Sequence, residues 1–150
     1  NLETGTFYTE SYRGSGGCSR ISSTILTGGR FNFSVWDNSS SGAGLGGSHS
    51  VVSTSSVMDG EWHQVTCQWS NGTGNKSRGI YVYVNGVLEG YSEMTGNDGG
   101  YQHIHLGGVT GCMGEATHNV DFGPIIHYKN YNLSDNEVYQ NYSAHAARFK

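Results

Sequence analysis

The chain has 150 residues, a formal net charge of −4 and 13% charged residues, and at this length one domain buries roughly 70% of its unfolded surface. Its eight Lys and Arg are scattered, and no apolar run reaches the ~18 residues of a membrane-spanning helix, which argues against nucleic acid, an anionic membrane surface and membrane insertion. With 24 Gly and a single Pro, the composition predicts short strands and tight turns in one domain over residues 1–150.

Three strands are predicted in the first 37 residues, with Gly-rich breaks between them. They cover Thr6 to Arg13, Ile21 to Thr27 and Arg30 to Asp37. The third strand alternates strictly between apolar and polar residues, so three of its apolar side chains are expected on the core face: Phe31, Phe33 and Val35. Trp36 is expected on the opposite face.

A long Gly/Ser-rich loop is predicted from residue 38 to residue 50. Binding surfaces often lie on such loops at the end of a β-sandwich, because the sheets hold the loops in place. A short strand at Val51 and Val52 then leads into the central part of the chain.

The stretch from Asp59 to Glu89 predicts the centre of an antiparallel sheet. Two segments in it, EWHQVTCQWS and GIYVYVNG, are rich in aromatic and β-branched residues with a period of two. Asn85-Gly86 after the second segment suits the positive-φ positions of a hairpin turn. One face is predicted to carry Val65, Cys67, Trp69, Ile80, Val82 and Val84, and the other face Gln64, Thr66, Gln68, Tyr81 and Tyr83.

The last third of the chain predicts further strands at Val87 to Tyr91, Tyr101 to Leu106 and Val120 to Tyr131, with Pro124 at a bulge or edge position. A helix is then expected from Ser134 to about Ala147. Ser134 and Glu137 fit a capping box, and Leu133 with Val138 fits a hydrophobic staple.

These residues carry a resemblance to a known family. The run Gly60, Trp62, His63 and Val65, followed by Tyr83 to Gly86, resembles the laminin-G-like branch of the concanavalin A-like lectin/glucanase superfamily. The closing LSDNEV run and short helix look similar to the end of such domains. The resemblance implies an all-β fold, an antiparallel two-sheet β-sandwich (jelly roll) with one short C-terminal helix.

The glucanase branch of this superfamily uses paired carboxylates, and a retaining glycosidase holds them about 5–5.5 Å apart. No Glu-x-Asp-x-x-Glu pattern that would give this spacing occurs in the sequence. Glu89 and Glu93 would share a strand face but lie about 13 Å apart. The sequence therefore predicts a protein that is not an enzyme.

Carbohydrate binding needs exposed aromatic rings that stack on sugars and polar groups that bind hydroxyls. The candidate residues for this role are Trp36, Tyr81, Tyr83, Tyr91, Tyr101, His103 and His105. A strand or subunit contact is the alternative for Trp36. The two histidines are alternatively ordinary polar residues of a sheet surface, or metal ligands if His63 and His127 lie on neighbouring strands.

Many laminin-G-like domains have a Ca²⁺ site at the rim, and the resemblance makes calcium the one cofactor to consider. The oxygen-bearing candidates are Asp37, Asn38, Asn97, Asp98 and Asp121. The alternative is that these are ordinary turn residues. Cys67 is predicted to be a buried small apolar residue, whereas Cys18 and Cys112 are either a disulfide or two free thiols.

Two functions remain open on the sequence. One is a non-catalytic, lectin-like module that binds a glycan or cell-surface polysaccharide. The other is a structural jelly roll that makes protein contacts or a homo-oligomer in a larger assembly. The low-charge composition and the run from Asn141 to Phe149 look similar to jelly rolls of bacteriophage tail fibres and capsid surfaces. An extracellular or virion-surface location is expected for either.

Overall fold

The computed structural model describes residues 5–11, 19–36, 48–94, 103–106, 121–128 and 130–149, without the side chains of residues 5–11, 19, 20, 36, 48 and 103–106. The elements in chain order are β1 (Gly5–Ser11), β2 (Ser19–Ile25), β3 (Arg30–Trp36), β4 (Ser48–Ser56), β5 (Val65–Ser70), β6 (Gly79–Val84), β7 (Val87–Glu93), β8 (His103–Leu106), α1 (Asp135–Ala146) and the 3-10 turn η1 (Ala147–Phe149). In this part of the chain, no helix is long and apolar enough to cross a bilayer.

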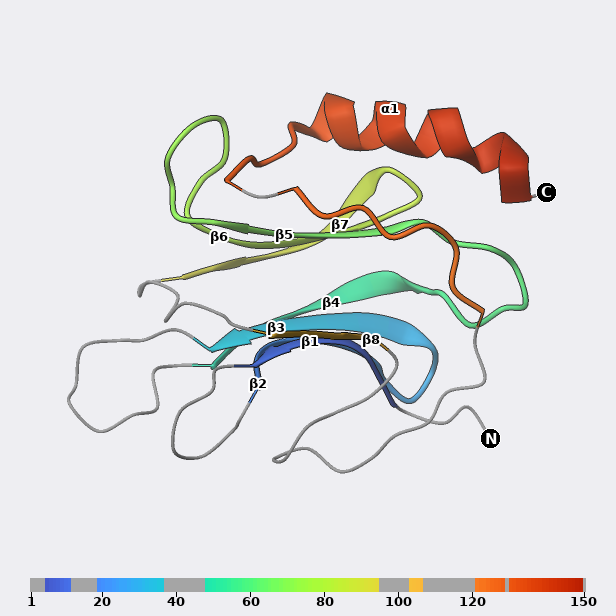
Figure 1. The fold of residues 1–150 in the computed structure, drawn as a ribbon, viewed down its shortest axis with the longest axis horizontal. Helices are drawn as coiled ribbons and strands as arrows, with labels where there is room; N and C mark the ends of the chain where they lie inside the picture. The colour runs from blue at the N-terminus through green and yellow to red at the C-terminus, as the bar shows by residue number, and fades with distance from the viewer. Residues whose placement is uncertain are drawn as a thin grey trace.

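The strands form two antiparallel sheets that face each other. One sheet has the order β4-β3-β2-β1-β8 and the other the order β5-β6-β7. Figure 1 shows the two sheets as layers, with α1 as a third layer over the three-stranded sheet. The chain passes to the second sheet after β4 and returns with β8, so the five-stranded sheet joins distant parts of the sequence, whereas the three-stranded sheet consists of consecutive strands. The predicted all-β jelly-roll sandwich with one C-terminal helix is confirmed.

The core lies between the two sheets, where the predicted apolar faces meet. β3 contributes Phe31, Phe33 and Val35, and β6 contributes Ile80, Val82 and Val84. Val65, Cys67 and Trp69 of β5 pack against this cluster. Cys67 is partly buried against this cluster, on the face that the alternation predicts, and burial raises the pKa of its thiol to about 12.

β6 is buried on both of its faces. Its alternating sequence predicted that only one face would be buried. Its outer face carries Tyr81 and Tyr83, which form a second apolar cluster with Leu133 and Val138. Leu133 directly precedes the N-cap of α1 and Val138 lies near its start, so the helix covers the outer face of the sheet. The capping box of Ser134 and Glu137 is present, and the predicted staple pair helps to hold α1 on β6.

The hairpin between β6 and β7 forms as the sequence predicts. Asn85 has φ 51° and Gly86 has φ 80°, the combination that type I′ turns require. The Asn85 side chain also accepts a hydrogen bond from the Gln64 amide at 3.1 Å. It donates to His63 Nδ1 at 3.1 Å, while His63 Nε2 contacts Asp59 at 2.9 Å. The Trp-His and Asn-Gly motifs therefore meet at one end of β5.

The two sheets approach each other closely where β4 faces β7. A Cβ atom at Gly90 would lie 2.4 Å from Val51 Cγ2 and 3.0 Å from the Val52 carbonyl oxygen. Glu89 accepts hydrogen bonds from the Ser55 amide at 2.9 Å and the Ser55 hydroxyl at 2.7 Å. Desolvation opposes the ionisation of Glu89, but its hydrogen bonds to Ser55 and Thr54 outweigh it and lower the pKa.

Two predicted elements differ from the structure. The strand expected at Val51 and Val52 extends over Ser48–Ser56, because it pairs along the whole length of β3. The strand expected from Val120 to Tyr131 is wrong, since residues 121–128 and 130–131 are not in a strand. Gly123 and Pro124 interrupt this segment, and proline cannot donate to a ladder. In Figure 1 most of its trace lies at a height between the three-stranded sheet and α1, and residues 121–128 are all exposed.

Candidate functional site

Two of the predicted sugar-stacking residues are buried. Tyr83 is 0% exposed and Tyr81 is 6% exposed, because α1 covers the face that the strand pattern leaves open. The prediction that they stack on a carbohydrate is therefore wrong for this arrangement. Tyr91, on β7, is exposed and lies with its ring centroid 4.8 Å from that of Tyr81.

The two tyrosines instead surround a buried lysine. Lys76 lies 4.9 Å from the centre of the Tyr81 ring and 5.0 Å from that of Tyr83, within cation–π range. Its Nζ also donates to the Tyr83 hydroxyl and to Asp135 Oδ1. Tyr83 donates to the same oxygen at 2.7 Å. Hydrogen bonds from Lys76 and Tyr83 lower the pKa of Asp135. This group connects the loop before β6 to the first turn of α1.

The remaining predicted site residues lie elsewhere or outside the described residues. Trp36 ends β3, and His103 and His105 lie on β8 at the edge of the five-stranded sheet. His63 precedes β5 in the other sheet and His127 is not in a strand, so neither occupies a strand beside β8. Tyr101, Asp37, Asn38, Asn97, Asp98, Cys18 and Cys112 fall outside the described residues.

Only one of the calcium candidates lies within the residues that the structure describes. Asp121 is described and exposed. Among the residues that the structure describes, no group of three or more His, Cys, Asp and Glu could hold a metal ion. The other calcium candidates lie beyond those residues, and the calcium prediction stays a prediction.

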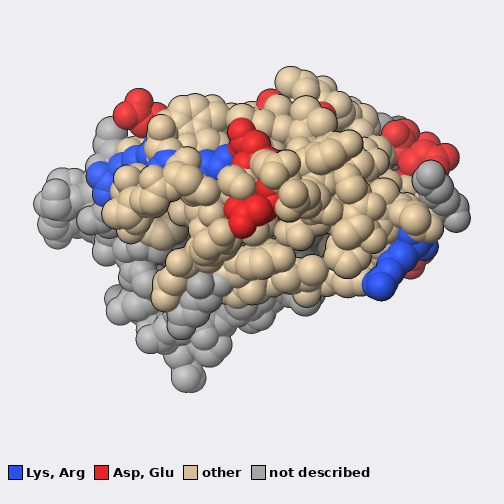
Figure 2. Space-filling model, turned by 90° about the horizontal axis from the view of Figure 1, so that it is seen from above, with Lys and Arg blue, Asp and Glu red and all other residues tan. Residues whose placement is uncertain are grey.

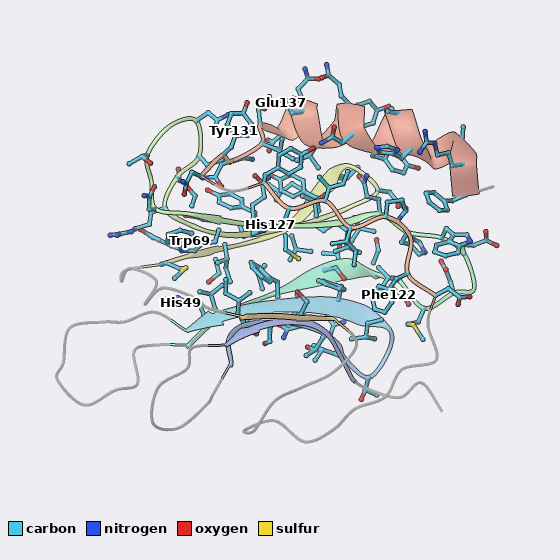
Figure 3. All side chains as sticks on the ribbon, viewed as in Figure 1. His49, Trp69, Phe122, His127, Tyr131 and Glu137 are labelled. Carbon is cyan, nitrogen blue, oxygen red and sulfur yellow. The ribbon has the colours of Figure 1, made fainter. Side chains whose placement is uncertain are left out.

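Exposed aromatic side chains follow the segment 121–131 where it runs beside α1. We call this set the aromatic row, and it consists of Trp62, Phe122, Tyr128, Tyr131 and Phe149. The first four are among the exposed large apolar residues, and Phe149 is half-buried. Figure 3 shows Phe122, His127 and Tyr131 in succession along the segment.

Side-chain contacts hold this segment against the helix. Tyr131 donates from its hydroxyl to Glu137 Oε1 at 2.6 Å, and Asn141 donates from Nδ2 to the Tyr128 hydroxyl at 3.2 Å. Glu137 and Asn141 are four residues apart, so they lie on one face of α1. The segment and the helix therefore run antiparallel. The Tyr131 hydroxyl in turn lowers the pKa of Glu137.

The far end of the row is built from three parts of the chain. The rings of Trp62 and Phe149 lie with their centroids 5.1 Å apart and their planes at 39°. A Cβ atom at position 123 would lie 3.3 Å from Phe149 and 3.9 Å from Trp62. Gly123 thus lets the segment pass against both rings. Trp62 precedes β5, whereas Phe149 ends η1, so this pair exists only in the folded chain.

The opposite side of α1 carries a different exposed group. Tyr139 is two residues from both Glu137 and Asn141, and therefore points away from the aromatic row. A Cβ atom at Gly86 would lie 3.1 Å from Tyr139 Cα, which places Tyr139 over the β6–β7 turn. Val87, Leu88 and Tyr91 of β7 are also exposed.

Sequence reasoning did not select the aromatic row. The sequence instead predicted a strand from Val120 to Tyr131, with Pro124 at a bulge or edge position. The Gly123-Pro124 pair is the signal that argues against a strand there. The four-residue spacing of Glu137 and Asn141 on a capped helix could have indicated a shared face, but nothing local pairs that face with Tyr131 and Tyr128.

Four of the described carboxylates are hydrogen-bonded to structural partners. Asp59 binds His63, Glu89 binds Ser55, Asp135 binds Lys76 and Tyr83, and Glu137 binds Ser134 and Tyr131. Hydrogen bonding to His63, together with that to the Glu61 amide, lowers the pKa of Asp59. In a retaining glycosidase the general acid and the nucleophile are two carboxyl groups about 5–5.5 Å apart.

One comparison identifies relatives of this chain. A laminin-G family model, described as the concanavalin A-like lectin/glucanases superfamily, matches residues 2–118. The match covers more than half of the chain but ends before the segment 121–131 and α1. No curated protein and no solved structure matches the sequence significantly.

Proposed function

Because the chain belongs to the concanavalin A-like lectin/glucanase superfamily, we propose that it is a non-catalytic carbohydrate-binding module, with the aromatic row as its binding surface. Membership alone does not decide this, since the superfamily contains both binding domains and glycosidases and a fold does not fix a function. The observation that carries the proposal is the set of exposed rings beside α1.

The chemistry of the row suits a sugar. Aromatic rings stack on the C–H faces of pyranoses, while amides, hydroxyls and carboxylates bind sugar hydroxyls. Tyr128 and Tyr131 provide rings whose hydroxyls are held by Asn141 and Glu137, so little side-chain freedom is lost when a ligand binds. Figure 2 shows that most atoms on the α1 side belong to uncharged residues.

The absence of hydrolysis is part of the same proposal. Each of the carboxylates of Asp59, Glu89, Asp135 and Glu137 is bound to a protein partner. The sequence also lacks the Glu-x-Asp-x-x-Glu pattern that would place two of them on one strand face. Incubation with β-glucans should therefore release no reducing sugar.

A glycan array with matched variants tests the proposal. Tyr131→Ala should abolish the discrete hits of the unchanged protein, whereas Tyr139→Ala should keep them. Both tyrosines are 54% exposed and lie on opposite sides of the same helix, so the pair separates the site from a general effect. Both variants should keep the fold by circular dichroism, although each loses a side-chain contact at α1. An array without hits, or equal losses in the two variants, would contradict the proposal.

A structural role in an assembly, such as a virion or cell-surface protein, is the alternative function. The exposed Val87, Leu88 and Tyr91 of β7 favour it, because apolar and aromatic side chains are typical of the centre of protein interfaces. Light scattering would then give an oligomer, and Leu88→Asp would convert it to a monomer. For the carbohydrate-binding module we expect a glycan-binding monomer that Leu88→Asp leaves unchanged.

A further inference from the structure

We infer that the aromatic row binds an uncharged polysaccharide as an extended chain that lies along α1 and spans several sugar units. This inference rests on the proposed function and adds the class and length of the ligand. Of the five residues in the row, only Trp62 lies inside the part of the chain that the family model matches. The row is therefore a feature of this chain's C-terminal part.

The length of the row indicates a ligand longer than one sugar. Tyr131 contacts α1 at Glu137, and the segment reaches Phe149 through Gly123. Between Glu137 and Phe149 the helix advances about 18 Å, at a rise of ~1.5 Å per residue. A single pyranose can contact only one end of such a row. A chain of several units can contact Tyr131 at one end and the Trp62–Phe149 pair at the other.

The shape of the surface supports an extended ligand as well. Phe122, Tyr128 and Tyr131 come from a segment that runs beside α1. Together with Trp62 they are exposed along the flank of the helix, and Phe149 is half-buried at its end. They do not converge on a single concave point. A module that recognises the end of a glycan would instead hold one sugar in a pocket, with polar groups directed at it from several sides.

The charge around the row argues against an acidic glycan. Its described ionisable neighbours are the carboxylates Glu61, Asp121 and Glu137, the cation Arg148 and the histidines His63, His127 and His145. The whole chain has a net charge of −4. Binding of sulfated or uronic polymers would require a cluster of cations. A neutral polymer pays no such electrostatic penalty and can use Glu137 and Asn141 as hydrogen-bond partners for its hydroxyls.

The two ends of the row are held by different elements, which gives the inference a sharp test. Because each stacked sugar adds modest affinity and the contacts are linked by one chain, the affinity should increase with chain length until both ends are occupied. Removing either end should abolish the advantage of the longer ligand and should leave the weak binding of the short one.

Isothermal titration with neutral oligosaccharides of defined length tests this directly. The probes are the disaccharide and the hexasaccharide of a β-1,4-glucan and of a β-1,3-glucan, with dextran sulfate as the charged probe. At least one hexasaccharide should bind about tenfold or more tightly than its disaccharide. Trp62→Ala and Tyr131→Ala should each reduce the hexasaccharide to the level of the disaccharide, and Tyr139→Ala should not.

The outcomes separate the inference from the proposed function. Equal affinity for the two lengths, or preference for dextran sulfate, would overturn the extended neutral ligand while carbohydrate binding stands. If Tyr139→Ala weakened hexasaccharide binding as much as Trp62→Ala and Tyr131→Ala do, the placement of the ligand on the aromatic row would be overturned. If neither these probes nor any glycan of the array binds at millimolar concentration, both the inference and the proposed function fail. Circular dichroism of each variant excludes loss of the fold as the cause.

Discussion

Among single residues, Lys76 and Asp135 have the most consequential positions. The Lys76 ammonium lies within 5.0 Å of the centres of two tyrosine rings. The Lys76 side chain as a whole is 8% exposed. A buried cation needs a nearby anion and hydrogen-bond acceptors, and Asp135 with the Tyr83 hydroxyl provides them. Asp135 also lies in the first turn of α1, where a carboxylate interacts favourably with the helix dipole.

We predict that Asp135→Asn lowers the free energy of unfolding by about 1 kcal/mol at pH 7, as expected for a largely exposed carboxylate at a helix start. Hydrogen bonds from Lys76 and Tyr83 depress the folded pKa of Asp135 below its usual value of 3.8, so the contribution of the carboxylate to stability is complete above that pH. It is lost as the pH falls through 3.8 towards the lower, folded pKa. Urea unfolding between pH 7 and pH 2.5 measures this, and the difference between the two proteins should shrink at the acidic end.

Asp121→Asn is the matched control, because Asp121 is exposed and lies away from Lys76. It should show no comparable loss at pH 7. A difference between Asp135→Asn and the unchanged protein that stays constant down to pH 2.5 would contradict the assigned network, since the loss would then not depend on the ionisation of the Asp135 carboxyl group.

Single residues also show why the selected tyrosines are not a site. Tyr81 and Tyr83 have the alternation and composition expected of an exposed strand face. They become interior residues only because Leu133 and Val138 pack on them. Aromatic residues that a strand pattern places outward are therefore ambiguous until the layer above the sheet is known.

At the level of elements, α1 rests directly on the β6–β7 turn. A Cβ atom at Gly86 would lie 3.1 Å from Tyr139 Cα and 3.1 Å from Tyr142 Cβ. This turn has two requirements that are independent of each other. The backbone needs a positive φ, and the helix above it needs space.

We predict that Gly86→Ala is more destabilising than Gly28→Ala by about 1 kcal/mol or more. Both glycines have positive φ, 80° at Gly86 and 91° at Gly28, but nothing lies within 4 Å of a Cβ atom at Gly28. The difference therefore isolates the contact with α1. Urea unfolding measures both variants, and equal losses would indicate that α1 does not press on the turn.

At the level of the whole molecule, the sandwich is closed where β4 and β7 meet. Glu89 accepts a hydrogen bond from the Ser55 amide, and the missing side chain of Gly90 lets β7 approach β4 closely. This contact joins the two sheets outside the apolar core. It also covers part of an edge that could otherwise pair with another chain.

We predict that Gly90→Ala destabilises the domain by about 1–3 kcal/mol, because the added methyl group overlaps Val51 and the β4 backbone. Ser92→Ala, two positions along the same strand, should cost much less. In a double-mutant cycle, Val51→Ala should recover part of the loss in Gly90→Ala. Additive losses in thermal or urea unfolding would contradict the proposed contact between the sheets.

The sequence by itself determined the parts of this protein that depend on neighbouring residues. Alternation along β3, β5 and β6 identified the core faces, because a strand turns successive side chains to opposite sides. Asn85-Gly86 identified the hairpin, and Ser134 with Glu137 identified the start of α1, because turn and cap chemistry are local. The family resemblance carried by these same motifs also indicated the jelly roll.

Only the tertiary structure decided where the layers meet. Whether the outer face of β6 contacts solvent or a helix depends on the direction in which α1 returns, and no local pattern fixes that direction. The aromatic row joins Trp62, the segment 121–131 and Phe149. More than 50 residues lie between Trp62 and the start of that segment. A surface assembled from distant segments is set by packing between elements, so the candidate site emerged only when the chain was folded.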